Sequence, residues 1–217
     1  MKLFVDTGSI KDIEAVVALG IIDGVTTNPS LLAKEPGDFR QNLKRICEIV
    51  NGPVSGEVTA TDTAGMLQQG HDIANIHQHM VVKVPLTKDG IKACKALSGE
   101  GIPVNVTLCF SAAQALLAAK AGATFVSPFV GRLDDIATNG MELIRDIVEI
   151  FDNYEFATEV LVASCRHPIH VVEAARMGAD ICTCPPAVID QLFNHPLTNI
   201  GLEKFLKDWE KAQAVKV

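Results

Sequence analysis

One lysine stands inside a run of β-branched residues. Residues 81–87 read VVKVPLT, and the valines on both sides of Lys83 predict the centre of a β-strand. Side chains alternate between the two faces of a strand, so Lys83 shares a face with Val81 and Pro85. A desolvated lysine amine can attack a ketone or an aldehyde and form a Schiff base. The alternative is a structural lysine that protects an edge strand from aggregation.

Polar residues also stand near the ends of most other predicted strands. They are Asp6, Asn28, Glu57, Asn105, Thr107, Ser127 and Ser164. A protonated imine withdraws electrons, so a neighbouring carbon–carbon bond can break in an aldol cleavage if a base accepts the hydroxyl proton. Asp6 and Glu57 are the candidate carboxylates for this transfer. The short side chains of Asn28, Asn105 and Ser127 suit hydrogen bonding to sugar hydroxyls.

Two arginines follow predicted strand ends in the second half of the chain. Arg132 lies in SPFVGRLDD and Arg166 lies in ASCRHP. Guanidinium groups bind phosphate through paired hydrogen bonds, which makes both residues candidates for a phosphate site. The alternative is that each arginine pairs with an acid such as Asp134 or Asp135.

Strand and helix patterns alternate along the whole chain. We expect strands over residues 2–6, 24–28, 54–59, 81–85, 104–108, 124–128, 159–164 and 181–185. Eight strand–helix units predict an α/β protein with a single (β/α)8 TIM barrel over residues 1–217. The alternative is an open doubly wound sheet, but no strand is followed by the G-x-G-x-x-G turn of dinucleotide-binding domains. In a barrel the C-terminal ends of the strands meet, which would bring the polar residues together.

The composition disfavours several classes of function. Lys and Arg number 19 against 26 Asp and Glu, so we expect no nucleic-acid partner and no membrane partner. Asp6 interrupts the early apolar residues, and no stretch approaches the ~18 apolar residues of a membrane span, which favours a cytoplasmic location. The six cysteines contain no C-x-x-C pair and are expected to be core thiols. We expect neither a metal nor another cofactor.

Seven short motifs occur in order along essentially the whole chain: FVDT (4–7), GVTTNPS (24–30), EVTA (57–60), VVKVP (81–85), VNVTLCFS (104–111), SPFVGR (127–132) and ASCRHP (163–168). Together they resemble the transaldolase family, and most closely its small subgroup, which also contains fructose-6-phosphate aldolases. The resemblance implies a class I (β/α)8 enzyme of the pentose phosphate pathway. Such an enzyme moves a dihydroxyacetone unit from sedoheptulose 7-phosphate to glyceraldehyde 3-phosphate, which gives erythrose 4-phosphate and fructose 6-phosphate.

The resemblance also implies a role for each matching residue. Lys83 would form the Schiff base, and Asp6 would be the base for aldol cleavage. Glu57 and Thr107 would hold the water used in imine formation. The substrate would be bound by residues from several strand ends: Asn28, Asn105 and Ser127 at the dihydroxyacetone hydroxyls, Phe129 beside them, and Arg132, Ser164 and Arg166 at the phosphate.

Two alternatives use the same motifs. The first is a fructose-6-phosphate aldolase, which releases free dihydroxyacetone. That branch carries Gln at the position of Glu57 and Tyr at the position of Phe129, so both residues of this chain favour transfer. The second is a barrel that binds sugar phosphates without turning them over, and such a protein would be expected to lack Lys83, Asp6 or Glu57.

The C-terminal segment predicts an extra helix over residues 199–214. Pro196 marks a break after the eighth helical segment. An apolar stripe follows at positions i, i+3, i+4 and i+7: Leu202, Phe205, Leu206 and Trp209. This stripe can cover one end of the barrel or reach a neighbouring chain. Because small transaldolases assemble as pentamers, often paired into decamers, the resemblance favours a homo-oligomer.

Overall fold

Eight parallel strands close into a barrel in chain order. The computed structural model describes residues 1–214. The strands are β1 (Lys2–Asp6), β2 (Gly24–Thr26), β3 (Val54–Glu57), β4 (Met80–Pro85), β5 (Val104–Cys109), β6 (Phe125–Pro128), β7 (Glu159–Val162) and β8 (Ile181–Cys184). Every strand end agrees with the expectation to within two residues. The predicted class, a (β/α)8 barrel with an additional C-terminal helix, is therefore confirmed.

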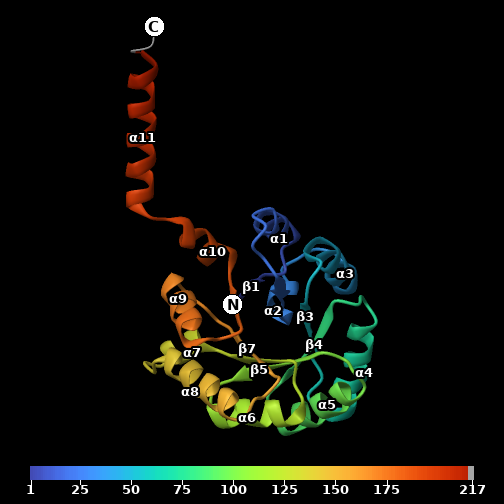
Figure 1. Cartoon of the computed structure of the whole chain (residues 1–217). Helices are drawn as coiled ribbons and strands as arrows, with labels where there is room; N and C mark the ends of the chain where they lie inside the picture. The colour runs from blue at the N-terminus through green and yellow to red at the C-terminus, as the bar shows by residue number, and fades with distance from the viewer. Residues whose placement is uncertain (215–217) are drawn as a thin grey trace.

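Most of the helices surround the barrel on its outer side (Figure 1). They are α1 (Ile10–Val17), α2 (Pro29–Leu32), α3 (Phe39–Val50), α4 (Thr63–Ala74), α5 (Lys88–Gly99), α6 (Ala112–Ala121), α7 (Val130–Asp134), α8 (Gly140–Asn153), α9 (Pro168–Met177), α10 (Pro186–Phe193) and α11 (Pro196–Ala214). Two short helices, α2 and α7, were not expected. Both lie shortly after a strand at the C-terminal end of the barrel, and Asn28, which caps α2, and Arg132 of α7 line the cavity described below.

Local side-chain chemistry fixes where several helices begin and end. Short polar side chains accept a hydrogen bond from a backbone N–H of the first helical turn at Ser9, Asp38, Asp62, Thr87 and Ser111. At the opposite ends of α6 and α9, Gly122 and Gly178 adopt φ of 88° and 83°. Glycine reaches this left-handed conformation without a steric penalty, so both helices end sharply there.

The interior of the barrel has an apolar floor and a polar layer nearer the C-terminal ends of the strands. The floor is a cluster of buried side chains: Phe4, Val81, Phe125, Leu161, Ala163 and Ile181. Lys83 follows Val81 on the same face of β4, as alternation predicts. The strand register places Lys83 beside Glu57 of β3 and Asn105 of β5. A second, larger core fills the layer between the strands and the helices and includes Val82 and Val84, which face outward.

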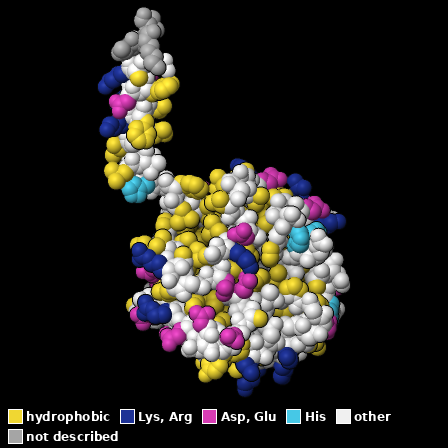
Figure 2. Space-filling view, viewed as in Figure 1, with side chains coloured by type: hydrophobic (Ala, Val, Ile, Leu, Met, Phe, Trp, Pro, Cys, Tyr) yellow, Lys and Arg dark blue, Asp and Glu magenta, His cyan; other side chains and the backbone are white. Residues whose placement is uncertain are grey.

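The C-terminal helix α11 extends away from the barrel (Figure 1). It begins at Pro196, three residues before the expected start, and none of its described residues is buried. Its apolar side chains are widely exposed; Phe205 and Trp209 show 71% and 63% of their surface. Figure 2 shows these side chains as patches along the projecting helix. Within residues 1–214, no helix has both the length and the apolar character needed to cross a membrane.

Candidate active site

Lys83 is enclosed at the C-terminal end of the barrel, with 4% of its surface exposed. Its Nζ lies 3.0 Å from Glu57 Oε2 and donates a hydrogen bond to the carbonyl oxygen of Thr27, also at 3.0 Å. A closed barrel has no edge strand, so the interpretation of Lys83 as an edge-strand lysine is wrong. The amine faces a carboxylate that can accept its proton, which equips it for nucleophilic attack.

Asp6 ends β1 and forms part of the same polar layer. Its Oδ1 accepts a hydrogen bond of 2.7 Å from Thr26 Oγ1, which in turn lies 2.7 Å from Thr183 Oγ1. Burial raises the pKa of Asp6 above its ordinary value of 3.8, although the Thr26 hydroxyl and the charge of Lys83 oppose the rise. A carboxylate with a raised pKa accepts a proton more readily, so Asp6 suits the role of general base.

A cavity of about 180 Å³ opens beside these groups. Eight of its lining residues are candidates from the sequence: Asp6, Asn28, Lys83, Ser127, Phe129, Arg132, Ser164 and Arg166. They come from β1, β4, β6, α7 and the segments that follow β2, β6 and β7. The fold therefore brings together groups that lie up to 160 residues apart in the sequence, from Asp6 to Arg166. The other three candidates, Glu57, Asn105 and Thr107, are not among the lining residues of this cavity.

Asn105 supports the hydroxyl of Ser127. Ser127 Oγ donates a 2.7 Å hydrogen bond to Asn105 Oδ1, and Asn105 Nδ2 donates to Ser55 Oγ at 3.2 Å. Asn105 is fully buried and Ser127 is 1% exposed. Because the hydroxyl hydrogen of Ser127 is committed to Asn105, the oxygen of Ser127 is the atom able to accept a hydrogen bond from a ligand.

Thr107 and Asn28 each retain an unused polar group. Thr107 Oγ1 is buried and makes no hydrogen bond with any residue in the range 1–214. An unpaired buried hydroxyl is unfavourable, and this oxygen has its hydrogen-bonding capacity available for a ligand or a water molecule. Asn28 Oδ1 caps α2 by accepting a hydrogen bond from the N–H of Leu31 at 2.9 Å. This contact fixes the side chain and leaves its Nδ2 group as the donor for a ligand.

The two arginines have different surroundings. Arg166 Nη2 lies 2.8 Å from Asp135 Oδ2, so the alternative of pairing with a neighbouring acid holds for this residue. The pair is exposed, with 49% and 55% of the side chains accessible, and exposed pairs contribute little free energy. The guanidinium carbon of Arg132 lies 5.7 Å from the ring centre of Phe129. Both arginines line the cavity, and a phosphate group can compete with an exposed carboxylate for Arg166.

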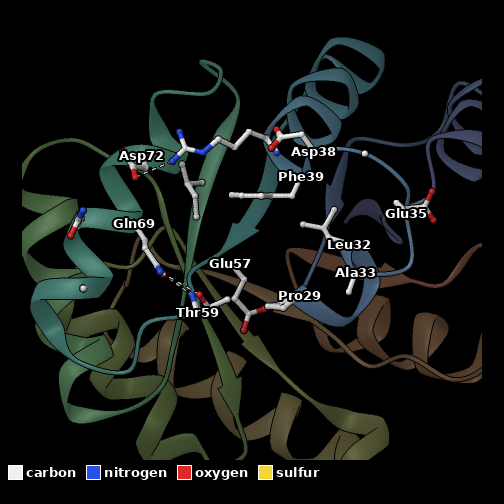
Figure 3. A pocket seen from close by; sticks show the side chains of 15 residues that line it. Pro29, Leu32, Ala33, Glu35, Asp38, Phe39, Glu57, Thr59, Gln69 and Asp72 are labelled. Carbon is white, nitrogen blue, oxygen red and sulfur yellow. Dashed lines mark hydrogen bonds and ion pairs between the residues drawn. The ribbon is translucent and has the colours of Figure 1, made fainter.

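A larger groove of about 830 Å³ lies next to the cavity and shares Glu57 with the Lys83 centre. Figure 3 shows Glu57 at one end of this groove, with Phe39 and Leu32 along its apolar wall. Its rim holds the exposed ion pair between Arg40 and Asp72, at 3.0 Å. The described residues that line the groove include neither a lysine nor Asp6, so the smaller cavity is the candidate active site.

Four polar contributors were missed from the sequence. Thr26 and Thr183 face inward beside Asp6, and alternation along GVT and ICTC is the signal that could have identified them. Ser55 is the analogous inward residue on β3. Thr27 contributes a backbone carbonyl, for which a side-chain pattern carries no signal.

Within residues 1–214, one group of three side chains has the spacing of metal ligands. The Sγ atoms of Cys165, Cys182 and Cys184 all lie within 4.8 Å of one another. Hydrogen bonds with the other two thiols, together with burial, raise the pKa of the Cys165 thiol well above its usual range. Cys182 and Cys184 lie on the opposite face of β8 from Thr183 and belong to the outer core. An ion held there would take no part in chemistry at Lys83.

Comparison with known proteins gives consistent matches over nearly the whole chain. Residues 3–216 match the family described as Transaldolase/Fructose-6-phosphate aldolase. A protein of Caldicellulosiruptor saccharolyticus named "probable transaldolase" is 59% identical over 97% of this chain and 98% of its own length. Proteins with the same name from Aquifex aeolicus and Nitrosopumilus maritimus are 58% and 57% identical, and the alignments cover 97% and 99% of this chain and 97% of each relative.

Proposed function

Because the chain belongs to the transaldolase/fructose-6-phosphate aldolase family, we propose that it is a transaldolase of the non-oxidative pentose phosphate pathway. It transfers a dihydroxyacetone unit from sedoheptulose 7-phosphate to glyceraldehyde 3-phosphate, forming fructose 6-phosphate and erythrose 4-phosphate. The observation that carries the proposal is the position of Lys83, whose amine is enclosed by Glu57 and a cavity that also holds Asp6 and two arginines.

The first step is attack of Lys83 Nζ on the ketone carbon of the donor. Glu57, 3.0 Å from Nζ, accepts the ammonium proton and returns a proton to the carbinolamine oxygen, which leaves as water. The product is a protonated imine, in which the former ketone carbon is bonded to Nζ. The unpaired hydroxyl of Thr107 supports a role in holding that water beside Glu57.

The second step breaks the C3–C4 bond of the donor, which joins the two carbons that follow the former ketone carbon C2. Asp6 removes the proton of the C4 hydroxyl, the C3–C4 bond breaks, and its electron pair moves into the imine to give an enamine. The aldose phosphate leaves with its new aldehyde group. The enamine carbon then attacks the aldehyde of the acceptor, Asp6 returns the proton to the new hydroxyl, and hydrolysis of the imine releases the product.

The surrounding polar groups suit a bound sugar phosphate. Asn28 and Ser127 present one donor and one acceptor to the dihydroxyacetone hydroxyls, with Asn105 fixing Ser127. Arg132 and Arg166 offer guanidinium groups for the phosphate at the far side of the cavity, where Ser164 also lies. No step of this scheme uses a metal or a cofactor.

Transfer is favoured over simple aldol cleavage by the residues around the enamine. A transferase must keep the enamine from being protonated before the acceptor arrives. Phe129 has no hydroxyl that could organise a water molecule there. Its ring centre lies 5.9 Å from that of Phe110 and 5.7 Å from the guanidinium carbon of Arg132.

Product analysis with fructose 6-phosphate tests the proposal. We expect little free dihydroxyacetone without an acceptor aldose phosphate and rapid formation of a new ketose phosphate when the acceptor is added. Release of dihydroxyacetone at the same rate with and without acceptor would identify an aldolase. Absence of turnover in both reactions would indicate a barrel that binds sugar phosphates without converting them.

We also propose that the protein is a cytoplasmic homo-oligomer, a pentamer or decamer, assembled through α11. The exposed stripe of α11 supports this, because an apolar surface of this kind is unusual on a monomer. The groove beside Glu57 is a suitable receiving surface on a second copy, since it has an apolar wall at Leu32 and Phe39 and a partly acidic rim.

A further inference from the structure

The C-terminal end of helix α7 is connected to Arg166 at two points, the guanidinium group and the backbone N–H. Asp135, which caps the C-terminus of α7, binds the guanidinium group at 2.8 Å. Asp134, the preceding residue, reaches the backbone of Arg166 indirectly through His170 of α9. Two consecutive acids at the C-terminal end of one short helix therefore contact the side chain of the same arginine directly and its main chain through His170.

The imidazole of His170 connects α7 to the backbone at Arg166, using both of its nitrogens. Nδ1 accepts a 3.1 Å hydrogen bond from the N–H of Arg166, and Nε2 lies 3.0 Å from Asp134 Oδ2. An acceptor at Nδ1 requires the neutral ring with its hydrogen on Nε2, which is the tautomer that Asp134 stabilises. Burial and the neighbouring His167 lower the pKa of His170, which keeps the ring in this neutral form.

The His170 ring is buried, and both the ring and Asp134 make further contacts. His170 is 4% exposed, and its ring centre lies 3.9 Å from that of His167. The second carboxylate oxygen of Asp134 accepts a 2.9 Å hydrogen bond from the N–H of Gly140, where α8 begins. A buried ring with both nitrogens bonded has one defined orientation, so it can transmit the position of α7 to the Arg166 backbone.

The segment before Arg166 is also tied to α7. The N–H of Gly131 donates to the carbonyl oxygen of Ser164 at 3.1 Å, and Ser164 adopts a left-handed φ of 59° that is uncommon for a residue with a side chain. A Cβ at Gly131 would lie 2.7 Å from Cγ and Nε of Arg166, so the two segments are in close contact. Residues 164–166 thus depend on nearby contacts for their conformation.

We propose that His170 and Asp134 are positioning residues that fix the backbone of Arg166, so that its guanidinium group is directed at the phosphate end of the cavity. The inference rests on the proposed function for the identity of the ligand class, a phosphate monoester. It adds two residues that do not line the cavity and would act on binding through Arg166 alone.

Calorimetric titration with inorganic phosphate tests the bridge without requiring turnover. His170→Phe fills the ring volume but removes both nitrogens, and we expect it to weaken phosphate binding about 3- to 10-fold, as for the loss of one neutral hydrogen bond. His170→Asn places an oxygen near the position of Nδ1 and should retain most of the affinity. His170→Gln reaches toward Asp134 but lacks that acceptor, so it should behave like His170→Phe and serves if the latter does not fold.

A second histidine–carboxylate pair, on the surface of the barrel, provides the control. His71 Nε2 lies 2.6 Å from Glu100 Oε2 on the outer helices, away from the cavity, so His71→Phe should leave phosphate affinity unchanged. In an Arg166→Ala background, His170→Phe should cause no further loss. An equal loss with and without Arg166, or native affinity in both His170→Phe and His170→Gln, would refute the positioning role. Failure of the native protein to bind phosphate would instead overturn the assignment of the arginines as well.

Discussion

Glu57 and Lys83 face each other on neighbouring strands, with Oε2 3.0 Å from Nζ. Glu57 is also part of the larger groove, so one carboxylate contacts both the Lys83 amine and a more open region. The carboxylate thus combines two properties that proton exchange at a buried amine needs: contact with the amine and partial access to solvent, at 14% of its side chain.

Replacing Glu57 by Gln together with Phe129 by Tyr should raise the share of free dihydroxyacetone. The amide leaves Lys83 without its carboxylate, and the added hydroxyl can organise a water molecule near the enamine, so protonation competes better with transfer. The ratio of dihydroxyacetone released to ketose formed, measured by chromatography, reports this change. An unchanged ratio in the double variant would contradict the role given to these positions, and each single variant serves as a control.

Borohydride should trap the substrate on Lys83. Reduction in the presence of fructose 6-phosphate is expected to add a reduced dihydroxyacetone unit to the peptide that contains Lys83, because Lys83 is the only lysine among the described residues that line the cavity. Peptide mass spectrometry locates the label. Modification of Lys88 or Lys92 instead would disprove the mechanism. Lys83→Met has a side chain of similar length and should retain a native circular dichroism spectrum while showing no trapping.

Asp6→Asn should slow cleavage by about 10²–10⁴-fold and leave imine formation intact. The native rate should fall as the pH drops through the raised pKa of Asp6, so the acidic limb of the profile lies above pH 3.8. Stopped-flow measurement of aldose release, with borohydride trapping in parallel, separates the two steps. Loss of trapping in Asp6→Asn would mean that Asp6 acts before cleavage.

The raised pKa of Asp6 also predicts an effect on the stability of the folded protein. Because the folded-state pKa of Asp6 is raised, the folded protein binds more protons than the unfolded chain between pH 3.8 and that pKa. Proton binding by Asp6 therefore stabilises the folded state at low pH, and this stabilisation is lost as the pH rises through the raised pKa. Asp6→Asn should accordingly have a higher melting temperature than the native protein at pH 7, and a lower one would argue against net destabilisation by the buried carboxylate.

If the proposed assembly through α11 is correct, charged substitutions on this helix should dissociate it. Burial of Phe205 and Trp209 against a second copy would contribute several kcal/mol, roughly 25 cal/mol per Å² of apolar surface, and glutamate at both positions removes that gain. Light scattering should show a smaller species for the Phe205→Glu, Trp209→Glu variant. Leu117→Glu on α6 alters an apolar residue that is 54% exposed and is the matched control. A native monomer, or an unchanged mass in the double variant, would refute assembly through α11.

The strands were predictable because each contains β-branched residues and ends at a polar residue or a turn. The face occupied by Lys83 followed from alternation alone, and the barrel then determined which polar residues meet. Helix α2 has recognisable signals, since Asn28 caps it and Pro29 occupies its first turn. Helix α7 does not: Phe129 provides no side-chain cap, and the helix is held by long-range contacts with residues 163 and 164. The bridge through His170 joins segments 36 residues apart in the sequence, from Asp134 to His170, so local patterns could not identify it.

The apolar floor of the barrel also restricts the order of events. Phe4, Phe125 and Leu161 fill the interior beyond Lys83, so ligands have no passage through the barrel. On the proposed function, the aldose fragment would then depart on the side of the barrel from which the acceptor enters. A cavity of about 180 Å³ favours departure of the first aldose before the second binds. That order would be a ping-pong sequence, in which a donor-loaded enzyme intermediate exists alone before the second substrate binds.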